Sequence, residues 1–164
     1  MERILITGNS GAGKTTLSKI IAAKYDLPLI HLDTEFWQPE WKTPDMDWWR
    51  TRVEELAAGK RWVMEGNFAS TFDIRFPRAT TLIHFDFPGV FCIYRCIKRR
   101  IQVGSRVRSD MAPGCSERFD FNFYKYVWNY PKKHSPIVYA EAAKIFTGKF
   151  IVVKSVSDVA KLEI

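Results

Sequence analysis

The sequence predicts an α/β fold in which a parallel sheet lies between two layers of helices. Short apolar runs, of the kind that form buried parallel strands, alternate with longer stretches of helical spacing. A glycine-rich loop joins the first such strand to the first helix. The chain has 164 residues, of which 46% are hydrophobic, so we expect one domain over residues 1–164 with a sizeable core.

Residues 3–7 form the first predicted strand, and the loop after it, Gly8 to Thr15, carries the chemistry. It fits the phosphate-loop pattern of a glycine, any four residues and Gly-Lys-Thr. Its backbone N–H groups and the start of the helix would face a polyphosphate. Lys14 is expected to reach the phosphates of ATP, and the Thr15 hydroxyl to ligate Mg²⁺ directly. The predicted nucleotide-binding residues here are Gly8, Asn9, Ser10, Gly11, Ala12, Gly13, Lys14, Thr15 and Thr16.

After a helix over 14–24, a short strand over 28–32 ends at Asp33. Ligands of parallel α/β sheets bind beyond the carboxyl ends of the strands. Asp33 is therefore expected near the phosphates, where its carboxylate organises Mg²⁺ through water or takes a proton from an acceptor. The alternative is a loop aspartate that caps the next turn.

The segment from 35 to 49 is rich in aromatic residues and prolines. Two interpretations fit it, and both can hold: a small hydrophobic flap, or the wall of a substrate pocket. We expect the region of about 33–60 to bind the acceptor, with Trp37 as one contact. Asp45 or Asp47 would cap a helix that runs to about residue 58. The aromatic residues are Phe36, Trp37, Trp41, Trp48 and Trp49.

The third predicted strand, 61–64, is followed by Glu65, whose carboxylate should help to order Mg²⁺ through water. One or two helical turns then lead to Arg75, which is expected to face the acceptor. The fourth strand, 80–85, contains His84. A lone histidine within a strand is more often structural than catalytic, and we interpret it so.

The next helix, predicted over 86–102, places Arg95 and Arg99 on one face because they are four residues apart. The connection after it, about 102–116, combines glycines, a proline, Arg106 and Arg108. Such a segment is typical of a mobile lid whose arginines fork around phosphate oxygens. The alternative is a solvated basic face.

Glu117 is expected to open an aromatic helical stretch that Pro131 bends or ends. A further helix over 134–146, a last strand over 150–153 and a short terminal helix complete the prediction.

The formal net charge of +7 allows an anionic substrate or nucleic acid as a partner. No DNA-reading module is recognisable, so nucleic acid is the less favoured partner. The three cysteines are too few for a disulfide framework and favour a reducing, cytoplasmic location. No apolar run reaches the roughly 18 residues of a membrane span, and Met1-Glu2-Arg3 leaves no room for a signal peptide.

The residues Asp86-Phe87-Pro88, followed by Arg95 and Arg99, resemble the adenylate kinase helix that opens into the lid. Glu65-Gly66 is similar to the Asp-Gly that ends the third strand there. The resemblance implies nucleotide contacts at Arg95, catalytic arginines at Arg99, Arg106 and Arg108, and a five-stranded sheet in the order 2-3-1-4-5. Nearly the whole chain also resembles the adenylate kinase-like DNA topology modulation proteins, through His31-Leu32-Asp33, Trp37, Trp41, Glu65-Gly66-Asn67, Arg108-Ser109-Asp110, Pro113-Gly114-Cys115 and Glu117-Arg118-Phe119-Asp120.

The sequence therefore predicts a small P-loop kinase that transfers the γ-phosphoryl group of ATP to a small-molecule acceptor, with Mg²⁺. Lys14, Asp33, Arg99, Arg106 and Arg108 are the expected catalytic residues, and Asp33 is the expected base. The alternative is an ATP-gated regulatory protein that influences DNA topology.

Overall fold

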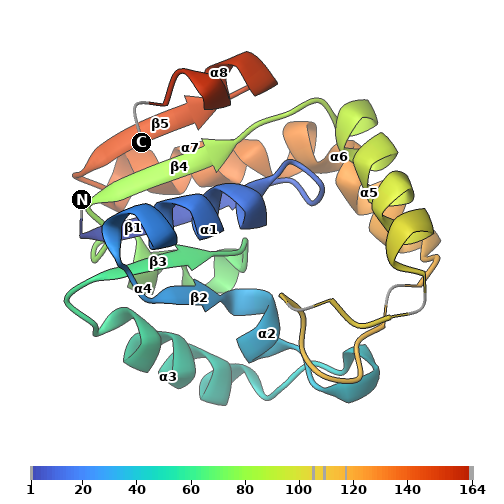
Figure 1. The fold of residues 1–164 in the computed structure, drawn as a ribbon. Helices are drawn as coiled ribbons and strands as arrows, with labels where there is room; N and C mark the ends of the chain where they lie inside the picture. The colour runs from blue at the N-terminus through green and yellow to red at the C-terminus, as the bar shows by residue number, and fades with distance from the viewer. Residues whose placement is uncertain (1, 105, 109, 117, 163–164) are drawn as a thin grey trace.

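A computed structural model describes residues 2–104, 106–108, 110–116 and 118–162, and Figure 1 shows its fold. Its sheet has five strands in the order β2-β3-β1-β4-β5, and all neighbouring strands pair in parallel. The predicted fold class and strand order are therefore confirmed. The strands are β1 (Arg3–Gly8), β2 (Leu29–His31), β3 (Trp62–Glu65), β4 (Thr81–Phe85) and β5 (Lys149–Val153).

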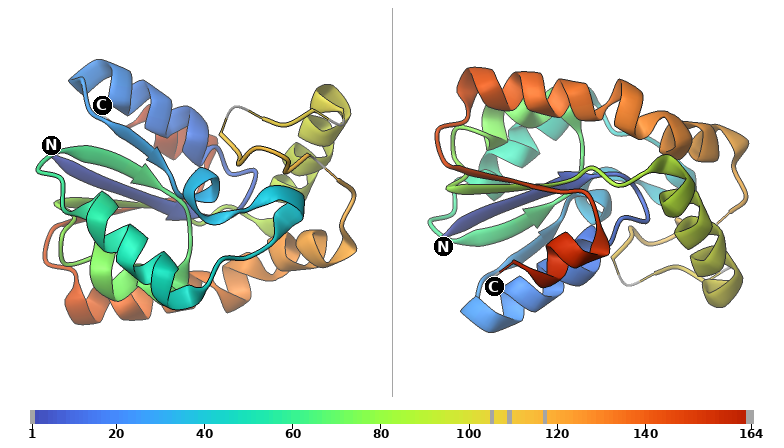
Figure 2. Two further views of the ribbon diagram at one scale, coloured as in Figure 1. Left: turned by 90° about the horizontal axis from the view of Figure 1, so that it is seen from below. Right: turned by 90° about the horizontal axis from the view of Figure 1, so that it is seen from above.

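Helices cover both faces of the sheet, as the two views of Figure 2 show. The helices are α1 (Lys14–Tyr25), α2 (Leu32–Phe36), α3 (Met46–Ala57), α4 (Phe72–Arg75), α5 (Gly89–Val103), α6 (Phe121–Lys133), α7 (Ser135–Ile145) and α8 (Val156–Ala160), with short 3-10 turns η1 (Pro39–Trp41) and η2 (Ala69–Thr71). No helix in the described part of the chain is long and apolar enough to cross a membrane.

Each face of the sheet has its own core because side chains alternate along a strand. On β1, Ile4 and Ile6 pack with the buried side chains of α1 and α5, such as Leu17 and Cys92. Leu5 points the other way, into a core formed with α3, α4 and α7. The cysteines of α5, Cys92 and Cys96, are buried thiols.

The register aligns the carboxyl ends of three strands with the phosphate loop. His31 lies opposite Glu65, Glu65 lies opposite Ile6, and Gly8 lies opposite Phe85. In Figure 1 this edge of the sheet faces α2, α5 and the segment between α5 and α6. The residues after β1, β2 and β3 therefore meet in one place.

The second strand is shorter than predicted, because α2 begins at Leu32 directly after it. Asp33 consequently lies in the first turn of a short helix and not at a strand end. The prediction of a capped helix after Pro44 is confirmed: the Asp45 side chain accepts hydrogen bonds from the N–H groups of Asp47 and Trp48.

Pro131 lies inside α6 and does not end it, because the helix continues to Lys133. A proline lacks the N–H that would bond to the carbonyl four residues earlier. That carbonyl, at Val127, accepts instead from the Asn9 side chain at 2.8 Å. Glu117, which was expected to open this helix, lies outside the described residues, and the Asp120 side chain caps α6.

Candidate active site

The phosphate loop adopts a conformation that only glycine allows at two positions. Gly8 has a φ of 133° and Gly11 a φ of 79°. A Cβ atom at Gly8 would lie 2.4 Å from the carbonyl oxygen of Phe85, and one at Gly11 would lie 2.6 Å from that of Cys92. The loop is therefore pressed against β4 and α5, which fixes its curvature.

The N-terminus of α1 opens into the cavity without a cap. Gly13 precedes the helix and makes no side-chain capping bond, and the first turn contains no acidic residue. The Lys14 ammonium group donates to the carbonyl of Asn9 at 3.1 Å, so its charge lies back over the loop. Unsatisfied N–H groups and a nearby cation together suit a polyphosphate.

Side chains from two other elements hold this loop from behind. The Oδ1 atom of Asn67 accepts from the N–H of Gly8 at 2.9 Å and from the Tyr130 hydroxyl at 3.0 Å. Its amide nitrogen donates to the Tyr126 hydroxyl at 3.1 Å. The Asn9 side chain is fully buried and bonds to Val127, so it faces α6 and does not line the cavity.

The Thr15 hydroxyl lies between two carboxylates. It is 3.0 Å from Oε1 of Glu65 and 3.2 Å from Oδ2 of Asp110. The same Glu65 oxygen lies 2.8 Å from Nδ1 of His31. A hydroxyl oxygen beside carboxylate oxygens is a hard donor set, which fits Mg²⁺.

Two neighbouring carboxyl groups have pKa values shifted in opposite directions. Burial, and then the charge of Glu65, raise the pKa of Asp33. Burial acts to raise the pKa of Glu65 as well, but the hydrogen bond from His31 and the charge of Lys14 outweigh it and lower that pKa. Such a division suits Asp33 to accept a proton while Glu65 stays ionised.

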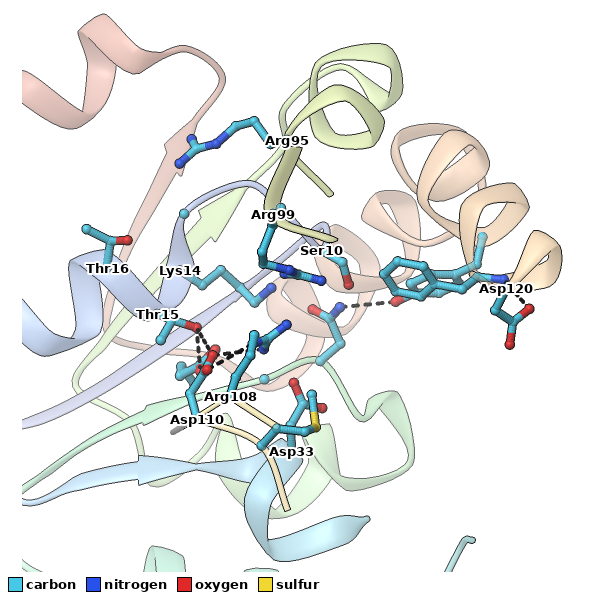
Figure 3. Close-up of a pocket in the computed structure, with 18 of the residues that line it drawn as sticks. Ser10, Lys14, Thr15, Thr16, Asp33, Arg95, Arg99, Arg108, Asp110 and Asp120 are labelled. Atoms are coloured by element: carbon cyan, nitrogen blue, oxygen red, sulfur yellow. Dashed lines mark hydrogen bonds and ion pairs between the residues drawn. The ribbon is translucent and has the colours of Figure 1, made fainter. Parts of the chain in front are cut away.

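Arginines approach the cavity from α5 and from the segment after it (Figure 3). Arg95 and Arg99 of α5 line it together with Arg108. The Arg95 guanidinium donates to the Ala12 carbonyl at 3.4 Å. Arg106 is exposed and does not line the cavity, and its contact with phosphates stays a prediction.

Arg108 forms a two-pronged ion pair with Asp110, with nitrogen–oxygen distances of 2.9 Å for both bonds. Burial acts to raise the pKa of Asp110, but this pairing outweighs it and lowers the pKa to about 2. Asp110 therefore stays ionised while it accepts from Thr15. The segment between α5 and α6 is thereby attached to the phosphate loop.

Arg75 does not face the cavity, which corrects the prediction that it contacts an acceptor. Its side chain is fully buried under the loop that follows β3. The guanidinium donates to the carbonyls of Gly66, Asn67 and Phe68. Arg75 thus shapes the loop that carries Asn67.

His84 is structural, as its position within a strand predicted. Its ring nitrogens contact the hydroxyl groups of Thr7 at 3.0 Å and Ser135 at 3.1 Å. Burial lowers the pKa of His84 to about 4, so the ring is neutral near neutral pH.

One cavity of about 1050 Å³ is lined by the phosphate loop, the carboxylates of Asp33 and Glu65, and the arginines of α5. It extends from the phosphate loop past Asp33 to Trp37 and Trp41, so the aromatic segment does wall a pocket. Part of the same segment packs inward, since Phe36 and Trp49 belong to the core. Residues 35–49 therefore both pack as a hydrophobic flap and line a cavity, and the binding of a substrate there stays a prediction.

Several cavity residues were not predicted from the sequence. Asn67 directly follows the Glu65-Gly66 pair, and that position was its signal. Asp110 lies within the arginine-rich segment, where an acid two residues from an arginine indicates an ion pair. The others not predicted to line it include Tyr94, Lys98, Gln102, Met111, Arg118, Asp120, Phe123 and Tyr126.

The solved structures that share this fold include three kinases. Shikimate kinase from Acinetobacter baumannii in complex with shikimate has a TM-score of 0.61 at 17% identity and covers 98% of this chain and 89% of its own. Shikimate kinase from Bacteroides thetaiotaomicron has a TM-score of 0.57 at 19% identity, with 93% and 85% covered. A gluconokinase from Sinorhizobium meliloti has a TM-score of 0.56 at 15% identity, with 98% and 86% covered. The fold is thus that of P-loop kinases.

A stretch of 35 residues is 51% identical to a shikimate kinase of Caldicellulosiruptor bescii. The stretch represents 21% of this chain, and the match spans about a fifth (20%) of that protein's length. No protein-family model matches the chain.

Proposed function

We propose that this protein is a small-molecule kinase, which transfers the γ-phosphoryl group of ATP to a hydroxyl group of its acceptor. One observation carries the proposal: a single cavity joins an uncapped phosphate loop to a carboxylate of raised pKa, with arginines between them. The first part binds the donor, the second accepts a proton, and the third stabilises the transferred charge.

The comparisons support this reaction class. The similar folds include enzymes named as shikimate kinases and a gluconokinase. We therefore propose a small hydroxylated molecule as the acceptor. A relationship to the adenylate kinase-like DNA topology modulation proteins is a further hypothesis. It implies no reaction other than phosphoryl transfer.

Mg²⁺ would be held by the Thr15 hydroxyl directly and by Asp33 and Glu65 through water, and when bound it neutralises charge on the phosphates. Asp110 is a further oxygen donor beside Thr15. Lys14 and the backbone of Gly8–Thr15 hold the phosphates in line. Arg95 binds the nucleotide side of the cavity.

In the proposed step, the acceptor oxygen forms a bond to the γ-phosphorus while the bond from that phosphorus to the ADP oxygen breaks. Asp33 takes the proton of the attacking hydroxyl. Arg99 and Arg108 stabilise the charge on the transferred group. The segment of about 102–116 acts as a lid that excludes water and so suppresses hydrolysis of ATP.

The test is a measurement of ADP release from ATP and Mg²⁺, with and without a panel of small hydroxylated metabolites and nucleoside monophosphates. The proposal predicts slow release that at least one acceptor raises, and loss of that rise in Lys14→Ala. ATP that binds but is never consumed with any acceptor would instead favour a nucleotide-gated binding protein.

A further inference from the structure

One part of the cavity is walled by aromatic rings, and we call it the aromatic end. Trp37 and Trp41 line it from the segment after α2, and Phe123 and Tyr126 line it from α6. Phe68, which follows β3, adds a fifth ring. Asp33 lines the same cavity and lies below Lys14 in Figure 3. Aromatic side chains from separate elements therefore share one cavity with the proposed base.

These rings are held in place before any ligand binds. Trp37 packs edge-on against Phe36, with ring centroids 4.9 Å apart, and Phe36 packs on Phe68 at 4.6 Å. The ring centroids of Trp37 and Trp41 are 5.5 Å apart. The indole N–H of Trp41 donates to the carbonyl of Ser116 at 3.1 Å. Rigid aromatic walls favour a ligand that fits between them without rearrangement.

Two polar side chains at the aromatic end, Asn67 and Tyr126, are already bonded within the protein. Both polar atoms of the Asn67 amide are engaged, and the Tyr126 hydroxyl accepts one of those bonds. A polyhydroxylated acceptor needs many hydrogen-bond partners, because each buried hydroxyl left unpaired costs binding energy. The aromatic end offers few.

The cations here also have anionic partners. Arg108 pairs with Asp110 at 2.9 Å. The Arg118 guanidinium lies 3.4 Å from a carboxylate oxygen of Asp120 and stacks 5.6 Å over the Trp41 ring. In the described part of the chain, each arginine at the aromatic end thus has a carboxylate partner. A site for a sugar acid would instead present an arginine to the ligand's carboxylate.

We propose that the aromatic end binds an acceptor with a flat aromatic or heteroaromatic ring, which stacks on Trp37 and presents a hydroxyl group to Asp33. The inference rests on the proposed kinase function and names its acceptor class. The ring hydroxyl, or a hydroxymethyl group on the ring, loses its proton to Asp33 as its oxygen bonds to the γ-phosphorus. ADP leaves with the electrons of the broken bond, and the products are ADP and a ring-borne phosphate monoester.

The experiment compares two panels of acceptors with ATP and Mg²⁺: ring alcohols (pyridoxine and 4-hydroxybenzyl alcohol) and polyol acids (shikimate and gluconate). We expect transfer to a ring alcohol. Trp37→Leu should raise the KM of that alcohol about tenfold, since stacking on the indole is lost, and leave the KM of ATP within about twofold. Trp37→Phe, which keeps a ring, should restore most of the affinity.

Trp48→Leu is the matched control, because Trp48 lies on α3, is 49% exposed and does not line the cavity. It should leave the KM of both substrates within about twofold. Transfer to shikimate or gluconate with no ring alcohol accepted would overturn the aromatic class and leave the kinase function standing.

If no acceptor in either panel reacts, calorimetry on the protein saturated with a non-hydrolysable ATP analogue and Mg²⁺ decides. Binding of a ring alcohol that weakens about tenfold in Trp37→Leu, and not in Trp48→Leu, supports the inference. No binding of any ring alcohol overturns it. The kinase proposal fails separately, if ATP does not bind or if no acceptor of the broader panel of hydroxylated metabolites and nucleoside monophosphates raises ADP release.

Discussion

The cavity has two halves that are built in different ways. The proposed donor half, residues 8–16 with α5, is built from backbone: glycines that cannot be replaced, an uncapped helix start and a loop that packs closely on its neighbours. The acceptor half, residues 33–41, 66–68 and 110–126, consists of side chains from α2, the loop after β3, the segment before α6 and α6 itself. Backbone geometry needs a fixed local pattern, whereas a wall of side chains needs only that several segments meet.

This difference explains why the donor half could be predicted from the sequence and the acceptor half could not. A phosphate loop consists of eight adjacent residues that together bind phosphate. The acceptor half draws on residues up to 93 positions apart, from Asp33 to Tyr126. Changes in the donor half should therefore stop the reaction with every acceptor, and changes in the acceptor half should act on particular acceptors or on proton transfer.

The largest effect is expected for Lys14→Ala. Loss of the ammonium group removes the charge that holds the phosphates, and turnover should fall by about 10⁴ or more. The measurement is ADP release under single-turnover conditions. Lys19→Ala, on the exposed side of the same helix, is the control and should stay near the wild-type rate. Near-normal turnover in Lys14→Ala would contradict the proposed role of Lys14 in holding the phosphates.

Arg99→Ala should lower kcat by about 10³, because an arginine that stabilises the transferred charge contributes on that order. Arg106→Ala is the matched comparison: it removes the same charge from the neighbouring segment, but Arg106 is exposed and outside the cavity. We expect less than a tenfold loss there. An equal loss in both variants would show that lid closure brings Arg106 to the phosphates. Arg106 would then belong to the donor half.

Asp33→Asn should lower kcat by about 10² and leave ATP binding nearly unchanged, since it removes the base and not the phosphate site. The wild-type rate should fall as the pH drops through the pKa of Asp33, because only the ionised carboxylate accepts a proton. Burial raises that pKa, so the acidic limb should lie above the range usual for aspartate. The pH profile of kcat/KM checks this, and an acidic limb that persists in Asp33→Asn would assign it to another group.

The smallest effect concerns the support of the loop. Asn9→Ala leaves the buried Val127 carbonyl without its hydrogen bond, which should lower the free energy of unfolding by about 1–3 kcal/mol. Urea denaturation measures it. In Asn129→Ala the lost bond, to the Lys125 carbonyl, is exposed, so a change of less than about 0.5 kcal/mol is expected. Equal losses of unfolding free energy in the two variants would contradict a stabilising role for the buried bond between Asn9 and Val127.

Most of the fold was predictable because strand and helix periodicity is local. The five strands follow from buried apolar runs that alternate with helices, whereas the order of the sheet came from the resemblance to adenylate kinases. The limits of β2 and α6 were not predictable in this way. α2 begins where periodicity alone extends the strand, and Pro131 is tolerated because a side chain 122 positions earlier uses the carbonyl that it leaves free.

The same contrast between local patterns and contacts between distant residues applies to the candidate site. Lys14, Thr15, Glu65 and Asp33 lie together because parallel strands end at one edge of the sheet. Arg75 was misjudged: an arginine at the end of a helical turn gives no sign that three backbone carbonyls enclose it. Asp110 was missed because its role depends on the path of the whole segment back to Thr15.

The most direct test follows the label of γ-³²P-ATP in the presence of Mg²⁺ and the acceptor panel. A kinase with a donor half and an acceptor half predicts label on an acceptor molecule, little label in inorganic phosphate, and neither product in Lys14→Ala. Label that appears only as inorganic phosphate, at a rate that no acceptor changes, would contradict phosphoryl transfer as the function of this cavity.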